Sequence, residues 1–166
     1  MRATSPVSVL LSTAVIFAAP AAAKYPSMPK PLLGIWVTDD AKGRTQCEAY
    51  QVALGQGLDV ARDQLVGAEI ISRKLVHSYA EYGEGNFYQP TAIRSDSKQS
   101  WTLKTRVGFD QVPGGEHTGS AEFTLSLRAG KLVWVNLSYD GKPVDRNEEI
   151  TLSRCADVPA NLYGRS

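Results

Sequence analysis

The chain has 166 residues, of which 43% are hydrophobic and 21% are charged, with 18 basic and 17 acidic residues. This length and apolar content are typical of one globular domain with a hydrophobic core. They exclude a disordered protein, a collagen-like repeat and a disulfide-dense miniprotein. The net charge is close to zero and the basic residues are scattered, which disfavours nucleic-acid binding and a polybasic membrane-binding patch.

The first 23 residues have the pattern of a secretory signal peptide. Arg2 supplies positive charge, residues 9–19 are almost entirely apolar, and small residues end the segment at Ala23. The apolar stretch is shorter than the ~20 residues that cross a membrane. We therefore expect cleavage after Ala23, no membrane span, and a mature protein in a bacterial periplasm or outside the cell. An uncleaved anchor is the alternative.

Residues 24–31 contain three prolines, and proline restricts both itself and its predecessor to extended backbone. This segment is predicted to form an extended arm that leads into the fold. Residues 32–166 show no internal repeat, low-complexity stretch or change of composition, which indicates a single domain.

Apolar and polar residues alternate with a period of two through much of the chain, which predicts β-strands. In residues 131–139 the alternation places Val133, Val135, Leu137 and Tyr139 on one face. The predicted strands are residues 32–38, 65–72, 75–80, 86–95, 100–109, 121–128, 131–139 and 149–155.

Two segments depart from the simple strand pattern. Residues 86–95 contain Pro90, which favours an edge strand or a bulge. Residues 48–64 are ambiguous, because Leu58 and Ala61 have helical spacing but glycines interrupt the pattern. At most one short helix is expected there.

Eight short strands without long intervening helices predict an all-β protein, as an antiparallel barrel or a sandwich. A barrel has no free edges, so we favour a small up-and-down barrel of about eight strands.

Cys47 and Cys155 are the only two cysteines. In an oxidising compartment two isolated cysteines most simply form one disulfide, which here would tie an early segment to the last strand. A metal site is disfavoured because neither a CxxC motif nor a histidine pair is present. A catalytic cysteine is disfavoured because oxidation would block the nucleophile. We predict no metal and no cofactor.

The opening strand carries Gly34-Ile35-Trp36, and the closing strand carries Arg154 beside Cys155. This arrangement resembles the lipocalin-like (calycin-type) barrels. The resemblance implies that Gly34, Trp36 and Arg154 form the barrel floor, where an indole fills the closed end and a guanidinium lies on its face. Bacterial periplasmic inhibitors of secreted metalloproteases are also similar, with a small barrel, one disulfide and an inhibitory N-terminal arm.

Catalytic motifs are not evident in the sequence. His77 and His117 lack the spacing of zinc ligands, and neither a Gly-x-Ser-x-Gly motif nor a phosphate-binding loop is present. Glu81 and Glu84 flank a glycine turn and are interpreted as solvated side chains. The sequence therefore predicts a protein without enzymatic activity.

Aromatic residues gather around the glycine turn within residues 77–88. Aromatic side chains with polar tips are frequent at binding sites, although core packing across a hairpin gives the same pattern. The candidate ligand-binding residues are Tyr79, Tyr82, Phe87, Tyr88 and Trp101.

These observations predict a secreted or periplasmic barrel that binds a small, partly apolar molecule. The alternative is a protein-binding module, such as an inhibitor of a secreted protease that acts through residues 24–31. A lumen lined by Trp101, Leu103 and Phe123 and large enough for a ligand would favour ligand binding, and a lumen filled by side chains would remove that hypothesis.

Overall fold

The structure, a computed structural model, describes residues 25–114, 118–145 and 148–163. The predicted signal peptide (1–23) and His117 lie outside these ranges. The strands are β1 (Gly34–Thr38), β2 (Glu69–Ile71), β3 (Val76–Tyr79), β4 (Gly85–Ser97), β5 (Ser100–Phe109), β6 (Thr118–Arg128), β7 (Lys131–Tyr139), β8 (Lys142–Pro143) and β9 (Glu149–Ala156).

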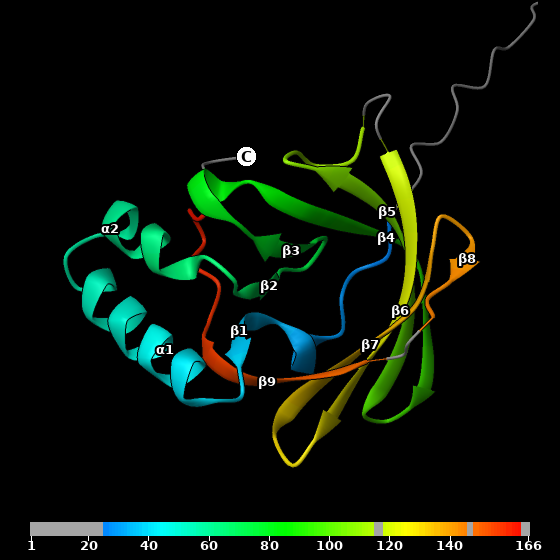
Figure 1. Cartoon of the computed structure of the whole chain (residues 1–166), viewed down its shortest axis with the longest axis horizontal. Helices are drawn as coiled ribbons and strands as arrows, with labels where there is room; N and C mark the ends of the chain where they lie inside the picture. Colours follow the sequence, from blue (N-terminus) through cyan, green and yellow to red (C-terminus); the bar gives the residue numbers. More distant parts are fainter. Residues whose placement is uncertain (1–24, 115–117, 146–147, 164–166) are drawn as a thin grey trace, which may run out of the picture.

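All strand pairings are antiparallel, and eight strands close into a barrel (Figure 1). The circuit runs from β1 through β2, β3, β4, β5, β6, β7 and β9 back to β1, while the short β8 pairs with β7. The predicted all-β barrel of about eight strands is confirmed, and each predicted strand overlaps one barrel strand. Proline produces the expected irregularity, because the β4–β5 register shifts between Pro90 and Ala92.

The period of two that placed Val133, Val135, Leu137 and Tyr139 on one face does not identify the face of residues 131–139 that lines the barrel. Leu132 and Trp134 join the core inside the barrel, and Trp134 pairs with Leu125 of β6. A register shift between Glu122 and Phe123 then changes the alternation along β7. Both faces of β7 carry apolar residues, so the period of two could not distinguish inside from outside.

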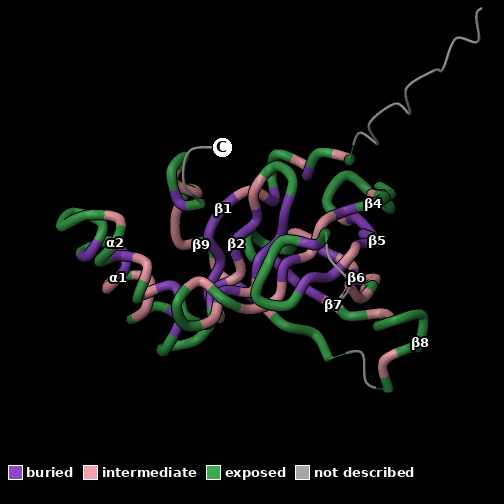
Figure 2. Tube along the Cα trace, turned by 90° about the horizontal axis from the view of Figure 1, so that it is seen from above, coloured by how far each residue is buried: buried purple, intermediate pink, exposed green. Residues whose placement is uncertain are grey.

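A closely packed core fills much of the barrel, and its buried residues appear purple in Figure 2. The N-terminal segment is part of this core, since Met28 and Leu32 are buried within it. The Met28 amide donates to Arg73 O (2.8 Å), and Trp36 Nε1 donates to Leu32 O (2.9 Å). The inner core consists of Met28, Leu32, Trp36, Ile71, Val76, Trp101, Leu103, Phe123, Leu125, Leu132, Trp134 and Leu152.

Helices cover the outer face of the barrel next to β1 (Figure 1). There are two of them, α1 (Ala41–Leu54) and α2 (Leu58–Arg62), where the sequence predicted one at most. Helix α1 approaches β1 so closely that a Cβ at Gly43 would lie 1.9 Å from Thr38 O. Three single-turn 3-10 helices are also present, η1 (Lys30–Leu32), η2 (Asp63–Leu65) and η3 (Glu81–Gly83). The outer core consists of Ile35, Val37, Tyr50, Ala53, Ala61, Leu65, Ala68, Ile70, Tyr79 and Leu162.

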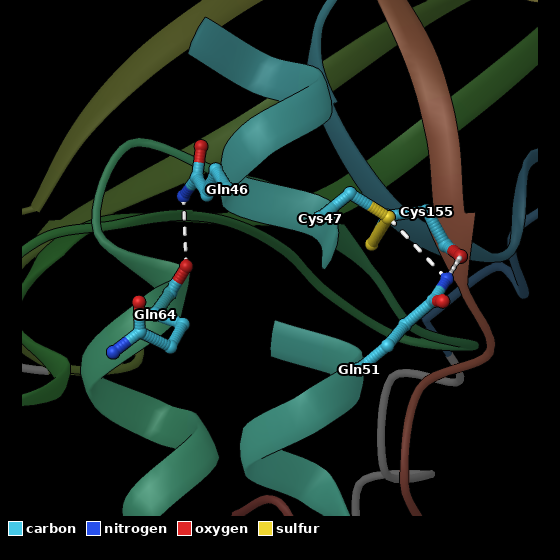
Figure 3. Close-up of a disulfide and its surroundings, with 5 residues drawn as sticks. All are labelled: Gln46, Cys47, Gln51, Gln64 and Cys155. Atoms are coloured by element: carbon cyan, nitrogen blue, oxygen red, sulfur yellow. Dashed lines mark hydrogen bonds between the residues drawn. A yellow bond between two sulfur atoms is a disulfide. The ribbon is translucent and has the colours of Figure 1, made fainter. Parts of the chain in front are cut away.

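Cys47 and Cys155 form the predicted disulfide, which joins α1 to β9 (Figure 3). The bond fastens the helical layer to the outside of the barrel, whereas closure itself comes from the strand pairings β1–β9 and β6–β7. Gln51 Nε2 lies beside the bond and donates to Cys155 O (3.3 Å). A cross-link that closes a loop of about 100 residues contributes up to ~4.7 kcal/mol in the chain-entropy model.

Within the described ranges, none of the helices has the length and apolar character required to cross a membrane.

Candidate functional site

The two ends of the barrel are built differently. Residues 25–33 pack against the end at which β1 begins, and Met28 and Leu32 fill it. The opposite end carries the connections from β1 to α1, from β3 to β4, from β5 to β6 and from β7 to β8. Inside the barrel, toward this second end, lies a cavity of about 180 Å³. It is lined by Glu69, Ser78, Tyr88, Trp134, Asn136, Ile150 and Leu152.

The cavity reaches the surface. Two of its lining residues are exposed, since Ile150 retains 44% of its accessible surface and Asn136 lies on the rim. Trp134 and Leu152, by contrast, are buried in the inner core. The lining therefore passes from solvent at the rim to packed side chains at the bottom.

Strand register places Glu69 inside the barrel. Glu69 pairs with Trp36 of β1 and with Ser78 of β3, and Trp36 belongs to the inner core. Successive residues of a strand point to opposite faces, so Ile70 joins the outer core and Ile71 the inner core. A carboxylate thus lies among the inward-facing residues of a strand that is packed on both sides.

Among the residues that the structure describes, one neutral group donates to the Glu69 carboxylate. The Ser78 hydroxyl lies 2.7 Å from Oε2 and 2.9 Å from Oε1, and its one hydrogen can serve only one of them at a time. Burial raises the pKa of Glu69 from 4.5 to about 7, against the opposite effect of the Ser78 hydrogen bond. Glu69 therefore exchanges its proton near neutral pH.

Aromatic rings form the opposite wall. The Tyr88 ring meets Phe123 and Trp134 edge-on, with centroids 5.4 and 5.7 Å apart, and Phe123 stacks on Trp134 at 4.2 Å. Trp134 Nε1 donates to Asn136 Oδ1 (2.7 Å), which ties the buried indole to the exposed Asn136 at the rim. Burial, and then the charge of Glu69, raise the pKa of Tyr88. The cavity thus combines one proton-exchanging carboxyl group with aromatic and aliphatic walls.

The predicted ligand-binding residues do not form one cluster. Tyr88 lines the barrel cavity, and Trp101 is buried in the inner core without lining a described cavity. Tyr79 belongs to the outer core, and Phe87 is buried against the ring of His77. Tyr82 is 96% exposed at the tip of the β3–β4 turn.

The lumen is largely filled by side chains, although the 180 Å³ cavity remains open within it. Trp101, Leu103 and Phe123 are buried in the inner core, and they do not line the remaining 180 Å³ cavity. Any ligand of the interior must therefore be small.

His77, one of the two histidines, has a structural environment. It is fully buried on the outer side of β3 and stacks on Phe87, with ring centroids 3.7 Å apart. Its Nε2 faces Glu84 O (2.9 Å) and must donate there, so Nδ1 accepts from the Tyr163 hydroxyl (3.1 Å). Burial lowers the pKa of His77, which favours the neutral ring. This histidine connects the β3–β4 turn to the C-terminal segment.

The residues predicted to form the barrel floor lie together. Trp36 is buried, and a Cβ at Gly34 would lie 2.9 Å from Arg154 Nε, so the arginine side chain crosses the backbone of this glycine. The Arg154 guanidinium donates to Leu33 O (3.3 and 3.4 Å) and pairs with Asp157.

Sequence reasoning missed Glu69, the central residue of the cavity. It lies in the run Gly67-Ala68-Glu69-Ile70-Ile71, where a charge inside an apolar segment is the only available signal.

Three larger hollows lie on the outside of the molecule, and the smallest of these, of about 530 Å³, lies between α1 and Val66. The second, of about 560 Å³, lies at Tyr79 and Tyr82, but its one cation, Arg62, is already paired with Asp59 and Leu162 O. The third, of about 660 Å³, lies between the β2–β3 turn and the C-terminal segment. None of the three combines a half-buried charge that lacks an ionic partner with apolar walls, as the barrel cavity does.

Fold and site together define a small, closed antiparallel β-barrel with a polar group at the wall of its internal cavity. Within the described ranges, side chains of His, Cys, Asp and Glu form no group of three that could hold a metal ion. No protein-family model, curated protein or solved structure matches the chain.

Proposed function

We propose that this protein is an exported, lipocalin-like barrel that binds a small, partly apolar ligand in its interior cavity and has no enzymatic activity. The observation that carries the proposal is the lining of the cavity, with aromatic and aliphatic walls around Glu69 and Ser78. Ligand sites characteristically combine apolar walls with a few polar groups that orient the ligand.

The size of the cavity limits the ligand. A cavity of about 150 Å³ holds a benzene molecule, so the 180 Å³ here suits a molecule with one small ring and a short polar substituent. Exposure of Ile150 at the rim provides an entrance.

Export is supported by two features. Residues 1–23 have the order of charge, apolar segment and small residues that marks a signal peptide. The Cys47–Cys155 disulfide is the kind of bond that persists in an oxidising compartment.

Ligand binding is favoured over inhibition through the N-terminal arm. Met28 and Leu32 are embedded in the inner core, so the segment that would have to enter a protease is occupied in closing the barrel. Withdrawing these two side chains would expose apolar surface at the barrel end.

The test is a titration monitored by the Trp134 indole N–H in a ¹H–¹⁵N spectrum. The probes are benzylammonium, benzyl alcohol and benzoate, each at up to ~10 mM. Binding of at least one probe should shift the Trp134 signal. Ile150→Trp, which narrows the rim, should weaken that binding, whereas Val60→Trp on the exposed face of α2 should leave it unchanged. If no probe moves the Trp134 signal, the proposal is wrong.

A further inference from the structure

The Glu69 carboxylate has unused capacity to accept hydrogen bonds. An ionised carboxylate offers about four acceptor positions. Among the described residues the Ser78 hydroxyl is the only donor that reaches it. The remaining acceptor positions adjoin the cavity, because Glu69 and Ser78 both line it.

None of the ion pairs formed by the described residues includes Glu69. Within the described chain, therefore, no cation compensates the charge of this carboxylate. Trp36 and Ser78 are its register partners on the adjacent strands, and Tyr88 and Trp134 line the same cavity. Of these only Tyr88 titrates, and burial raises its pKa further from neutrality. A carboxylate that is half-buried without a cation is unfavourable, and a positively charged ligand would remove that cost.

The aromatic walls suit the same kind of ligand. The negative faces of Tyr and Trp rings attract cations within about 6 Å of the ring centroid. Tyr88 and Trp134 both line the cavity and touch edge-on, with centroids 5.7 Å apart, so an apolar group would lie against the cavity side of this pair, with its polar end toward Glu69.

We infer that the cavity binds a small organic amine in its protonated form, with the ammonium group on Glu69 and the apolar body against Tyr88 and Trp134. This inference rests on the proposed ligand-binding function and specifies the chemical class of the ligand. A primary or secondary ammonium is favoured over a quaternary one because it can donate hydrogen bonds to the carboxylate.

Ligands without a single positive charge fit the cavity less well. An anion would meet the like charge of Glu69. A divalent metal ion prefers several oxygen ligands, and Glu69 is the one carboxylate in the lining. A neutral alcohol can donate to Glu69 but gains no charge pairing.

Binding is linked to proton release. Below neutral pH the free protein holds Glu69 largely as the carboxylic acid, and the bound ammonium requires the carboxylate. One proton therefore leaves the Glu69 carboxyl group for the buffer as each ammonium binds, and no bond in the ligand changes. The apparent affinity should increase about tenfold between pH 6 and pH 8, following the ionised fraction of Glu69.

The experiment compares benzylammonium with benzyl alcohol by isothermal titration calorimetry of the full mature chain. The two probes have the same size and a donor at the same position, and differ in charge. Benzylammonium should bind at least about tenfold more tightly than the alcohol at pH 8. Glu69→Gln, which keeps the size and an acceptor for Ser78, should remove this preference and leave alcohol binding within about twofold. Glu81→Gln, on the exposed β3–β4 turn, is the matched charge control and should change neither affinity.

Two failures are distinguishable. If none of benzylammonium, benzyl alcohol and benzoate binds in the cavity, the proposed function and this inference both fall. If benzyl alcohol or benzoate binds as tightly as benzylammonium, or if Glu69→Gln keeps the preference for the ammonium, the cavity binds ligands but the inference is wrong. A heat of binding at pH 6 that does not depend on the ionisation enthalpy of the buffer would also overturn it.

Discussion

The two faces of the β2–β3 pair bury polar groups in opposite ways. On the outer face His77 has a partner at each ring nitrogen and an aromatic ring stacked upon it. On the inner face the Ser78 hydroxyl is the one partner that Glu69 has within the described part of the chain, and a cavity lies beside it. A buried polar group with all its partners stabilises a fold, whereas one that lacks partners and faces open space is suited to a ligand.

The largest expected effect concerns the outer layer. Cys47→Ser combined with Cys155→Ser should lower the free energy of unfolding by about 2–5 kcal/mol, because the unfolded chain regains the freedom that the cross-link removes. Urea denaturation measures this loss. The Trp134 indole N–H signal should still shift when the probes are added, as in the parent protein, since α1 covers the outside of the barrel. Loss of probe binding in a variant that remains folded would show that the two faces are coupled.

His77→Ala should cost about 2–3 kcal/mol, since it leaves the Tyr163 hydroxyl and Glu84 O without their partner and removes a buried ring. His77→Gln should cost less because its amide can still donate to Glu84 O. Urea denaturation of both variants checks the order. Equal stability of His77→Ala and the parent protein would mean that these contacts contribute nothing.

Glu69→Gln should have the opposite effect to the two preceding changes and increase the free energy of unfolding. Because the pKa of Glu69 is raised in the folded state from 4.5 to about 7, the folded protein binds more protons than the unfolded chain between these values. Stability of the parent protein therefore falls as the pH rises through this window and then levels off. The variant should equal the parent near pH 4.5 and be about 2 kcal/mol more stable at pH 8, the full linkage being reduced for partial exposure. Urea titrations at both pH values test this, and a pH-independent difference would contradict it.

Tyr82→Ala should have the smallest effect. Its ring is almost fully exposed, so replacement removes little contact. The residue lies at a turn position with a left-handed φ of 57°. The free energy of unfolding should change by less than about 0.5 kcal/mol, and probe binding should not change. A tenfold weaker affinity for benzylammonium would place the ligand at the outer turn and not in the barrel.

The strands were predictable because most of them bury one face strongly. Phe123 and Leu125 alternate with partly exposed residues along β6, and the period of two follows directly. The irregularity of β4 was predictable because its cause is local: Pro90 has no backbone N–H to donate to the neighbouring strand. The helices were harder to predict, because α1 buries little more than Gly43, Tyr50 and Ala53 and so has a weak apolar stripe.

The sequence pattern did not predict the cavity. Ile70 and Ile71 are both buried, one under the helices and one inside the barrel, so local pattern could not assign Glu69 to a face. The aromatic cluster was divided for the same reason, since Phe87 and Tyr88 are neighbours in sequence and point to opposite sides of β4. Only the register of β1, β2 and β3 resolves these choices.

The most direct test of the unpaired carboxylate is the titration of the Glu69 side-chain carboxyl carbon by ¹³C NMR, with and without benzylammonium. We predict a midpoint near pH 7 in the free protein, and a lower midpoint when the ammonium is bound. A midpoint near 4.5 in the free protein that does not move with the probe would contradict the account.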